Sequence, residues 1–263
     1  MSTVSNNTRL TGLILALALS ACGGGSRNTT AVNQDPQGFW VGTTTSGYDL
    51  AAVVLENGDY YSLYSQNNIV VGANYGRLAV TGNNFTGSLN NIYITGNQFN
   101  SGTISGSFTP KSTLQGTSEH LGSKVGLFTT TYRTIYDTPA TLSAIAGTYT
   151  GPIYRTVGTA NISISKSGSV SGYTIGPESS LQKCIITGNV LPRASGKNVY
   201  DLTMVWSNNP DLNAPRCCLP GSTTCATNTP RTGISVVEGI YFYSAWVNAA
   251  RTSGFLWRGR KVE

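Results

Sequence analysis

Charged residues are scarce in this chain, and their scarcity narrows the fold class. Only 11% of the 263 residues are Asp, Glu, Lys or Arg, against roughly 25% in an average globular protein. Long surface helices, coiled coils and charged disordered segments all depend on such residues. The chain instead contains 31 glycines and 14 tyrosines. We therefore expect an extended, turn-rich, all-β protein whose length suits one large or two small domains.

Histidine is nearly absent as well, which limits the chemistry. Because His120 is the only histidine, zinc, copper or haem sites built from several histidines are excluded, and a Ser-His-Asp triad would have to use this residue. No G-x-S-x-G elbow, P-loop or dinucleotide fingerprint occurs. Residues 117–122 (TSEHLG) predict a polar loop with a solvated imidazole. We predict no enzyme activity, no cofactor and no metal site.

The acidic residues leave one catalytic alternative open. A glycoside hydrolase needs two carboxyl groups roughly 5–10 Å apart. The main acidic residues are Asp49, Glu56, Asp59, Asp137, Glu178, Asp201, Asp211 and Glu238. Any two of them would serve if the fold brought them together, although Glu56 and Asp59 fit a hairpin turn.

Long apolar runs are also missing, except near the start. Leu10 to Leu19 form a run of about 10 residues, too short for a bilayer of ~30 Å. Arg9 precedes this run, and the small residues Ser20 and Ala21 follow it. This arrangement is typical of a secretory signal.

The segment Leu19–Cys22 (LSAC) resembles the lipobox of bacterial lipoproteins. In that family the cysteine thiol receives a diacylglyceryl group, the chain is cut before it, and the new amine is acylated. The resemblance implies a signal peptide at 1–21 and, because Gly23 follows, delivery to the outer membrane through lipidated Cys22. Residues 22–37 then form the lipidated cysteine and a flexible tether of roughly 20–23 Å. The alternative is an ordinary signal peptide.

Four further cysteines predict a disulfide framework. They are Cys184, Cys217, Cys218 and Cys225. An even number in an exported protein predicts two disulfides, with three possible pairings. A bond between adjacent Cys217 and Cys218 is strained, so we favour Cys184 with one of them and Cys225 with the other. The alternative is a soft-metal thiolate site, which needs reduced cysteines in an oxidising compartment.

The body of the chain reads as a duplicated unit. Gly38–Gly42 (GFWVG) and Gly147–Gly151 (GTYTG) open alike, and each precedes an alternating strand and a glycine turn. Their offset of about 110 residues is too long for a solenoid and indicates two homologous domains. We expect β-domain 1 at 38–137, a short helical linker at 138–146 and β-domain 2, with the disulfides, at 147–263.

Each domain predicts a chain of hairpins. Asn57-Gly58 between hydrophobic runs is a strong hairpin signal. In the second domain we expect strands at 147–154, 159–165, 169–175, 183–191, 198–206, 231–238, 240–248 and 253–260. About eight consecutive antiparallel strands favour an up-and-down barrel, with an open sandwich as the alternative. In the linker, Thr138 can cap a helix, Pro139 suits its first position and Gly147 ends it.

Two resemblances bear on the architecture. Gly38-Phe39-Trp40 resembles the G-x-W start of lipocalins, in which the Trp plugs one barrel end; the second copy has Tyr149 instead. This implies a lipocalin-like barrel. Residues 136–151 and 196–201 resemble uncharacterised two-repeat lipoproteins of proteobacteria, a family that brings no assigned activity.

The remaining signals concern contacts. The C-terminal basic cluster (Arg251, Arg258, Arg260, Lys261) is too sparse for nucleic-acid binding, so we predict none. Most aromatic residues should fill barrel interiors, while some could contact a ligand or partner. Our contact candidates are Trp40, Tyr60, Tyr64, Trp206, Trp246, Trp257 and Arg258.

Three functions follow. The leading prediction is an outer-membrane-anchored lipoprotein that binds an envelope or cell-surface macromolecule without catalysis. The first alternative is a lipocalin-like carrier of a small apolar ligand, which requires an apolar cavity of at least ~300 Å³. The second alternative is a glycan hydrolase.

Overall fold

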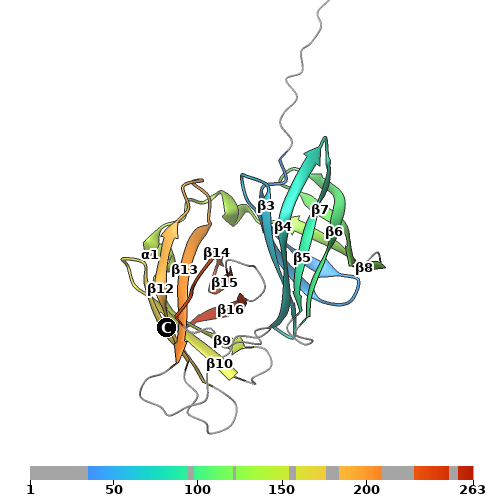
Figure 1. Cartoon of the computed structure of the whole chain (residues 1–263). Helices are drawn as coiled ribbons and strands as arrows, with labels where there is room; N and C mark the ends of the chain where they lie inside the picture. The colour runs from blue at the N-terminus through green and yellow to red at the C-terminus, as the bar shows by residue number, and fades with distance from the viewer. Residues whose placement is uncertain are drawn as a thin grey trace, which may run out of the picture. The chain divides into compact units, whose positions relative to one another are not determined.

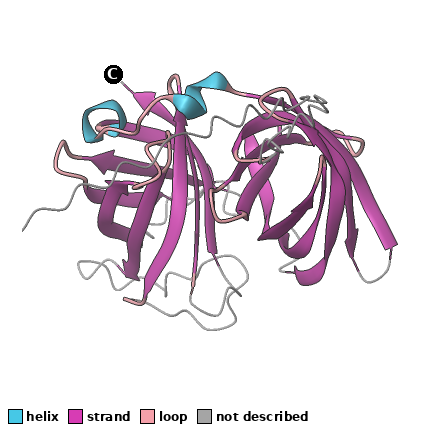
Figure 2. Ribbon diagram, turned by 90° about the horizontal axis from the view of Figure 1, so that it is seen from above, coloured by secondary structure: helices cyan, strands magenta, loops and turns pink. Residues whose placement is uncertain are grey.

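The protein consists of two closed antiparallel β-barrels in tandem. The computed structural model describes residues 35–93, 98–120, 123–153, 158–175, 184–208, 228–248 and 254–262. The predicted signal peptide, Cys22 and most of the predicted tether lie outside these residues. The described chain is almost entirely β-strand and forms two barrels of eight strands each (Figures 1 and 2). The predicted pair of up-and-down barrels is confirmed, and the alternative of an open sandwich is wrong.

Barrel 1 runs through the first eight strands in sequence order. These are β1 (Gly38–Thr44), β2 (Asp49–Val54), β3 (Asp59–Gln66), β4 (Ile69–Thr81), β5 (Asn84–Tyr93), β6 (Gln98–Thr109), β7 (Thr113–His120) and β8 (Ser123–Tyr132). Each strand pairs with the next, and β1 closes the barrel on β8. Gly58 adopts φ +81° in the turn between β2 and β3, the conformation that this hairpin requires.

Barrel 2 repeats this arrangement. Its strands are β9 (Gly147–Ile153), β10 (Gly158–Ile164), β11 (Ser169–Ile175), β12 (Cys184–Pro192), β13 (Tyr200–Asn208), β14 (Pro230–Glu238), β15 (Tyr241–Val247) and β16 (Gly254–Val262). Each end lies within two residues of its predicted position. Strand β16 closes on β9.

The aromatic residue of the duplicated opening plugs its barrel in the same way in both copies. Trp40 and Tyr149 are fully buried. The Trp40 indole N–H donates to the carbonyl of Pro36 at 2.9 Å, and the Tyr149 hydroxyl donates to the carbonyl of Ile145 at 2.8 Å. Both acceptors lie four residues before the ring. The substitution of Tyr for Trp therefore preserves the plug, because both rings carry a polar atom that needs a partner when buried.

The second glycine of the same motif permits closure. A Cβ on Gly42 would lie 2.0 Å from the carbonyl oxygen of Thr129 on β8, and one on Gly151 would lie 2.4 Å from that of Arg258 on β16. The first and last strands of each barrel thus approach more closely than a side chain would allow.

The predicted short helix between the barrels is present, but its cap differs from the prediction and a 3₁₀ turn precedes it. The linker contains a 3₁₀ turn, η2 (Thr134–Asp137), and a one-turn helix, α1 (Leu142–Ile145), whose cap is Thr141. The prediction of Thr138 as the cap and Pro139 as the first helical residue was wrong. Thr138 is extended and ends η2, because burial of the preceding Tyr136 side chain against both barrels fixes the path of the chain.

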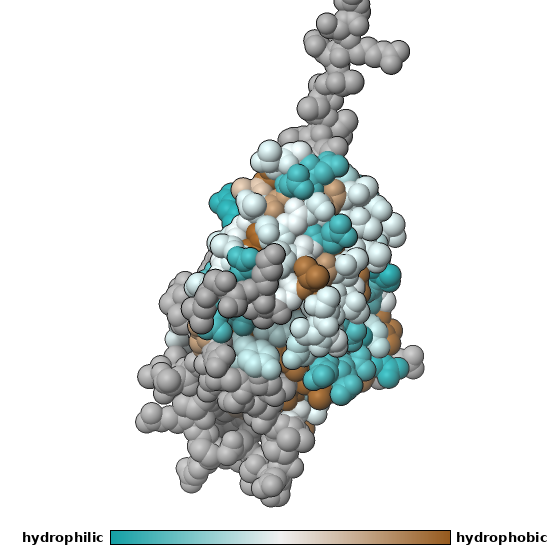
Figure 3. Space-filling model, turned by 90° about the vertical axis from the view of Figure 1, so that its right-hand side faces the viewer, coloured by the Kyte–Doolittle hydropathy of each residue, from teal (hydrophilic) through white to brown (hydrophobic). Residues whose placement is uncertain are grey.

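The two barrels share an apolar interface. Its buried residues fall into two groups, and each group draws on both barrels. They are Phe39, Val53, Leu55 and Tyr136 with Val199, Ile234 and Val236, and Leu63, Val70, Ala73, Tyr75 and Ile92 with Ala245, Val247 and Leu256. The face shown in Figure 3, by contrast, carries apolar residues only in small separate groups. Parts of the outer sides of β2–β5 and β14–β16 are therefore core, not surface.

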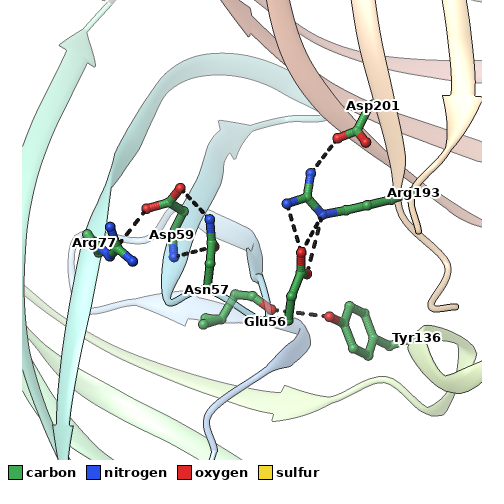
Figure 4. A network of polar contacts seen from close by, with 8 residues as sticks. Glu56, Asn57, Asp59, Arg77, Tyr136, Arg193 and Asp201 are labelled. Atoms are coloured by element: carbon green, nitrogen blue, oxygen red, sulfur yellow. Dashed lines mark hydrogen bonds and ion pairs between the residues drawn. The ribbon is translucent and has the colours of Figure 1, made fainter. Parts of the chain in front are cut away.

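Ion pairs surround this interface. The Asp137 carboxylate accepts from Lys111 of barrel 1 and Lys197 of barrel 2, both at 2.9 Å. Arg193 of barrel 2 lies 2.8 Å from Glu56 of barrel 1 and also pairs with Asp201 (Figure 4). The linker carboxylate thus connects the two barrels directly.

Closure should be sensitive to one methyl group at Gly42. We expect Gly42→Ala to lower the free energy of unfolding by about 2 kcal/mol or more, because the new Cβ meets the backbone of β8. Gly126→Ala is the matched control, since a Cβ there meets only the Ser46 hydroxyl, at 4.0 Å. Urea unfolding of both variants measures the difference. Equal stability would show that the close approach at Gly42 is not required.

The Asp137 bridge should give acid-sensitive stability. Hydrogen bonds from Lys111 and then Lys197 lower the pKa of Asp137 from 3.8 to about 2. Because the folded-state pKa lies below the unfolded-state value, the stabilisation is complete well above pH 3.8 and is lost as the pH falls towards 2. Asp137→Asn should cost about 1 kcal/mol at pH 7, since the carboxylate is one-third exposed and partly screened.

Urea unfolding at pH 7 and pH 2 tests the role of Asp137. The difference in the free energy of unfolding between wild type and Asp137→Asn should be smaller at pH 2 than at pH 7. Asp49→Asn, at an exposed carboxylate for which the described residues show no ion pair, is the control. A gap that does not depend on pH would contradict the assignment.

Candidate functional site

The interior of barrel 2 is filled by aromatic side chains. Trp206 is 4% exposed, and Trp246 and Trp257 are fully buried. The rings of Trp246 and Phe255 lie 4.5 Å apart between centroids, and those of Trp206 and Phe255 lie 5.1 Å apart. These three tryptophans were contact candidates, yet the structure places them in the barrel core, packed against one another. They form no surface for a partner.

Barrel 1 is packed at one end only. Trp40 closes that end, and Tyr60 lies above it with its hydroxyl donating to the carbonyl of Ser88 at 3.1 Å. Beyond them lies a small apolar chamber of about 70 Å³, whose lining includes Leu50, Ala52 and Phe128. Trp40 is therefore a structural plug, and Tyr60 lines the chamber.

A larger polar cavity, the vestibule, occupies the other end of barrel 1. Its volume is about 420 Å³, and it shares Tyr64, Asn74, Ser118 and other lining residues with the chamber. The two spaces therefore adjoin each other. The vestibule is lined by Thr44, Ser46, Tyr48, Tyr64, Asn74, Asn91, Tyr93, Asn100, Ser118, His120 and Gly126. Tyr64 is the one contact candidate that lies here.

Three asparagines cross the vestibule wall side by side. Asn74 on β4 is paired with Asn91 on β5, which is paired in turn with Asn100 on β6. Directly opposed residues of neighbouring strands point to the same face, here the interior. The Asn91 amide nitrogen donates to the Asn74 side-chain oxygen at 2.6 Å and to the Tyr64 hydroxyl at 2.8 Å. Asn74 and Asn91 are thus held in place by these hydrogen bonds.

Three tyrosine rings lie beside this row. The Tyr64 ring is 5.7 Å from that of Tyr48 and 6.4 Å from that of Tyr93, between centroids. The Tyr64 hydroxyl also donates to the carbonyl of Ile92 at 3.4 Å. Burial raises the pKa of Tyr64, so its phenol stays protonated and neutral.

His120 lies at the end of β7 and lines the vestibule. The prediction of a solvated loop histidine was wrong, because residues 113–120 form a strand and bring the imidazole inward, opposite Gly102 on β6. Its Nδ1 is buried without a hydrogen-bond partner. Burial lowers the pKa of His120, so the ring is neutral at pH 7 and can both donate and accept.

Arg258 lies on the outside of β16. Its guanidinium carbon is 4.0 Å from the centre of the Tyr241 ring, and its Nη1 donates to the side chain of Asn68 at 2.9 Å. Asn68 belongs to the turn between β3 and β4 of barrel 1. Arg258 therefore joins the two barrels. Of its cluster, Arg251 lies outside the described residues.

The cysteine framework is described at one position. Cys184 begins β12, is buried and is disulfide-bonded. Cys217, Cys218 and Cys225 lie outside the described residues. The predicted pairings remain predictions.

Five of the acidic candidates are engaged in ion pairs, namely Glu56, Asp59, Asp137, Asp201 and Glu238, whereas Asp49 shows no ion pair with the described residues. Glu56 pairs with Arg193 and Asp59 with Arg77 (Figure 4). Glu238 pairs with Arg133. Burial raises the pKa of Glu56, but the hydrogen bond and charge of Arg193 together with a backbone hydrogen bond outweigh it and lower the pKa. A glycosidase acid needs a raised pKa. Glu178 and Asp211 lie outside the described residues.

Two further features are absent from the described residues. The described segments contain no group of three or more His, Cys, Asp or Glu residues that could hold a metal ion. No helix within them is long and apolar enough to span a membrane.

The fold and the vestibule define this chain as an all-β protein of two tandem eight-stranded barrels, one of them with a cavity at its mouth. No family model matches the chain. No curated protein matches it either.

Among solved structures, the isotype 1 transferrin binding protein B from serogroup B Neisseria meningitidis is similar, with a TM-score of 0.31 and 10% sequence identity. The match covers 78% of this chain and 66% of that chain, which is less than two thirds of its length. A similarity at this level carries no argument about function.

The vestibule was not predicted from the sequence. Tyr48, Tyr93 and the three asparagines were not among the contact candidates. The signal that could have found them is register. Counting outward from the hairpin turn at Gly82 places Asn74 and Asn91 opposite each other.

Proposed function

We propose that this protein is a lipid-anchored, non-catalytic binding protein of the bacterial cell envelope, in which the vestibule of barrel 1 receives a protruding group of a macromolecular partner. The observation that carries this proposal is the vestibule of about 420 Å³, lined by neutral polar and aromatic side chains at the end of a barrel whose other end is plugged. Sites of roughly 300–1,000 Å³ with a few oriented polar groups are typical of ligand binding.

A carrier of an apolar ligand is less well supported. Such a ligand needs an enclosed apolar space of at least ~300 Å³, whereas the apolar chamber of barrel 1 measures about 70 Å³. The described interior of barrel 2 is occupied by its own aromatic rings. A polar vestibule above a small chamber suits the tip of a larger molecule better than a whole apolar one.

The supporting role of barrel 2 follows from the interface. Buried apolar residues and the bridge from Lys111 through Asp137 to Lys197 connect it to barrel 1. The wall of barrel 1 that a partner contacts is therefore held in place by packing against barrel 2, which reduces the conformational entropy lost on binding.

Site-specific photocrosslinking in intact cells tests the partner. A photoreactive residue in place of Ser46, which is exposed at the vestibule, should yield a crosslinked product of higher mass. The same residue in place of Ser167, an exposed serine in the turn between β10 and β11, is the matched control.

The crosslink should disappear when the vestibule is filled by Gly126→Phe, a position where a Cβ meets no backbone. Circular dichroism and urea unfolding of this variant verify its fold. A crosslink that survives the filling, or one equal at both serines, would overturn the vestibule as the contact.

The anchor has its own test. Cys22→Ser should abolish incorporation of labelled palmitate and release the protein from the membrane fraction, because the acyl chains supply the hydrophobic attachment. Protease treatment of intact cells, with a periplasmic protein as control, then distinguishes a protein on the outer face of the outer membrane from one on its periplasmic face. Unchanged palmitate labelling of Cys22→Ser would contradict the assignment of this cysteine.

A further inference from the structure

The described lining of the vestibule carries no fixed charge. Its eleven residues include no Asp, Glu, Lys or Arg, and His120 is neutral at pH 7. A phosphate, carboxylate or ammonium group entering this space would lose its hydration without gaining a counter-charge from these residues. Ionic ligands are therefore disfavoured, and a neutral ligand fits.

Nearly every polar group in the lining can both donate and accept hydrogen bonds. The asparagine amides, the serine, threonine and tyrosine hydroxyls and the neutral imidazole all have this property. A hydroxyl group on a ligand has it as well, so a polyhydroxylated molecule can satisfy such a lining in many orientations. A carbonyl-rich ligand only accepts hydrogen bonds and would leave acceptors of the lining unpaired, and a purely apolar ligand would leave both donors and acceptors unpaired, which is costly in a buried site.

One lining atom needs an external partner. The Nδ1 of His120 is buried and has no hydrogen-bond partner, although most buried polar atoms in proteins have one. The residue opposite it on β6 is Gly102, which presents no side chain, and the residue opposite it on β8 is Ser123. A ligand hydroxyl in the vestibule would supply the missing bond.

The tyrosine rings add an apolar component. Tyr48, Tyr64 and Tyr93 form a cluster with centroid separations of 5.7 and 6.4 Å beside the asparagine row. A ligand that uses both surfaces needs one flat face of C–H groups and a rim of hydroxyls. C–H groups pack favourably against aromatic faces. A pyranose ring has this shape and chemistry.

We propose that the vestibule of barrel 1 binds a neutral pyranose unit of a glycan. The tyrosine cluster packs against the C–H face of the sugar, while Asn100 and His120 hydrogen-bond its hydroxyls. This inference rests on the proposed function and specifies what the partner presents to the vestibule.

Saturation-transfer NMR on the full mature protein, purified in a detergent without a sugar headgroup, tests the inference. The probes are the methyl glycosides of glucose, galactose, mannose and N-acetylglucosamine, together with the peptide Gly-Asn-Gly. We expect transfer from the protein to the ring C–H protons of at least one glycoside. The peptide should give little signal.

Paired variants locate the binding. Tyr93→Leu should weaken the glycoside signal about fivefold or more, whereas Tyr93→Phe, which keeps the ring, should retain most of it. Gly126→Phe should abolish the signal by filling the space. Tyr173→Leu, at a partly exposed tyrosine on β11, is the matched control and should leave the signal unchanged.

The outcomes separate this inference from the proposed function. If no glycoside binds, or if Gly-Asn-Gly binds better, while the Ser46 crosslink persists, the pyranose assignment is overturned and the partner-binding role stands. A glycoside signal that survives Gly126→Phe also overturns it. Glycoside binding without any crosslink in cells would support the sugar site and overturn the proposal of a macromolecular partner.

Discussion

The interior of a closed eight-stranded barrel is wide enough for one set of side chains or one small ligand, and no more. In barrel 2 this space is filled by the side chains of Trp206, Trp246, Trp257 and Phe255, whose rings contact one another across the lumen. Barrel 1 fills only the end near Trp40. At its other end the inward positions are small or polar, and the vestibule is the volume that they leave. The same architecture thus yields a solid barrel and a barrel with a cavity.

The interface explains a pattern in the sequence that alternation alone does not. Residues 51–55 (AAVVL) are apolar at every position, whereas a strand with one wet face alternates. Ala52 and Val54 point into barrel 1, and Val53 and Leu55 pack in the cluster shared with barrel 2. The run is continuous because both faces of β2 are buried. The composition of residues 51–55 therefore reflects both the strand and the contact between the two domains.

Turn chemistry made the strands predictable, because Gly58, Gly168 and Gly239 adopt the positive φ that hairpins need, and strand ends follow from turns. The linker was harder, since tertiary burial of Tyr136 overrides the local capping signal at Thr138. The site was hardest. Large aromatic residues were chosen as contacts for their size, yet size is what places them in a core. The vestibule is lined by neutral residues that lie at the same level along the barrel axis. Identifying these residues from the sequence requires the register of the strands.

The position of the plug also bears on how an anchored protein would present its site. The chain enters barrel 1 at the closed end, where the carbonyl of Pro36 accepts the hydrogen bond from Trp40. Strand β1 then runs from this plug to Thr44 in the vestibule lining. A lipid on Cys22 would therefore be joined through the tether to the plugged end, and the vestibule lies at the opposite end of the same strand. A binding site built at the end of a barrel is accessible to a partner only if the anchor is attached elsewhere, and the order of Pro36, Trp40 and Thr44 along the chain satisfies this condition.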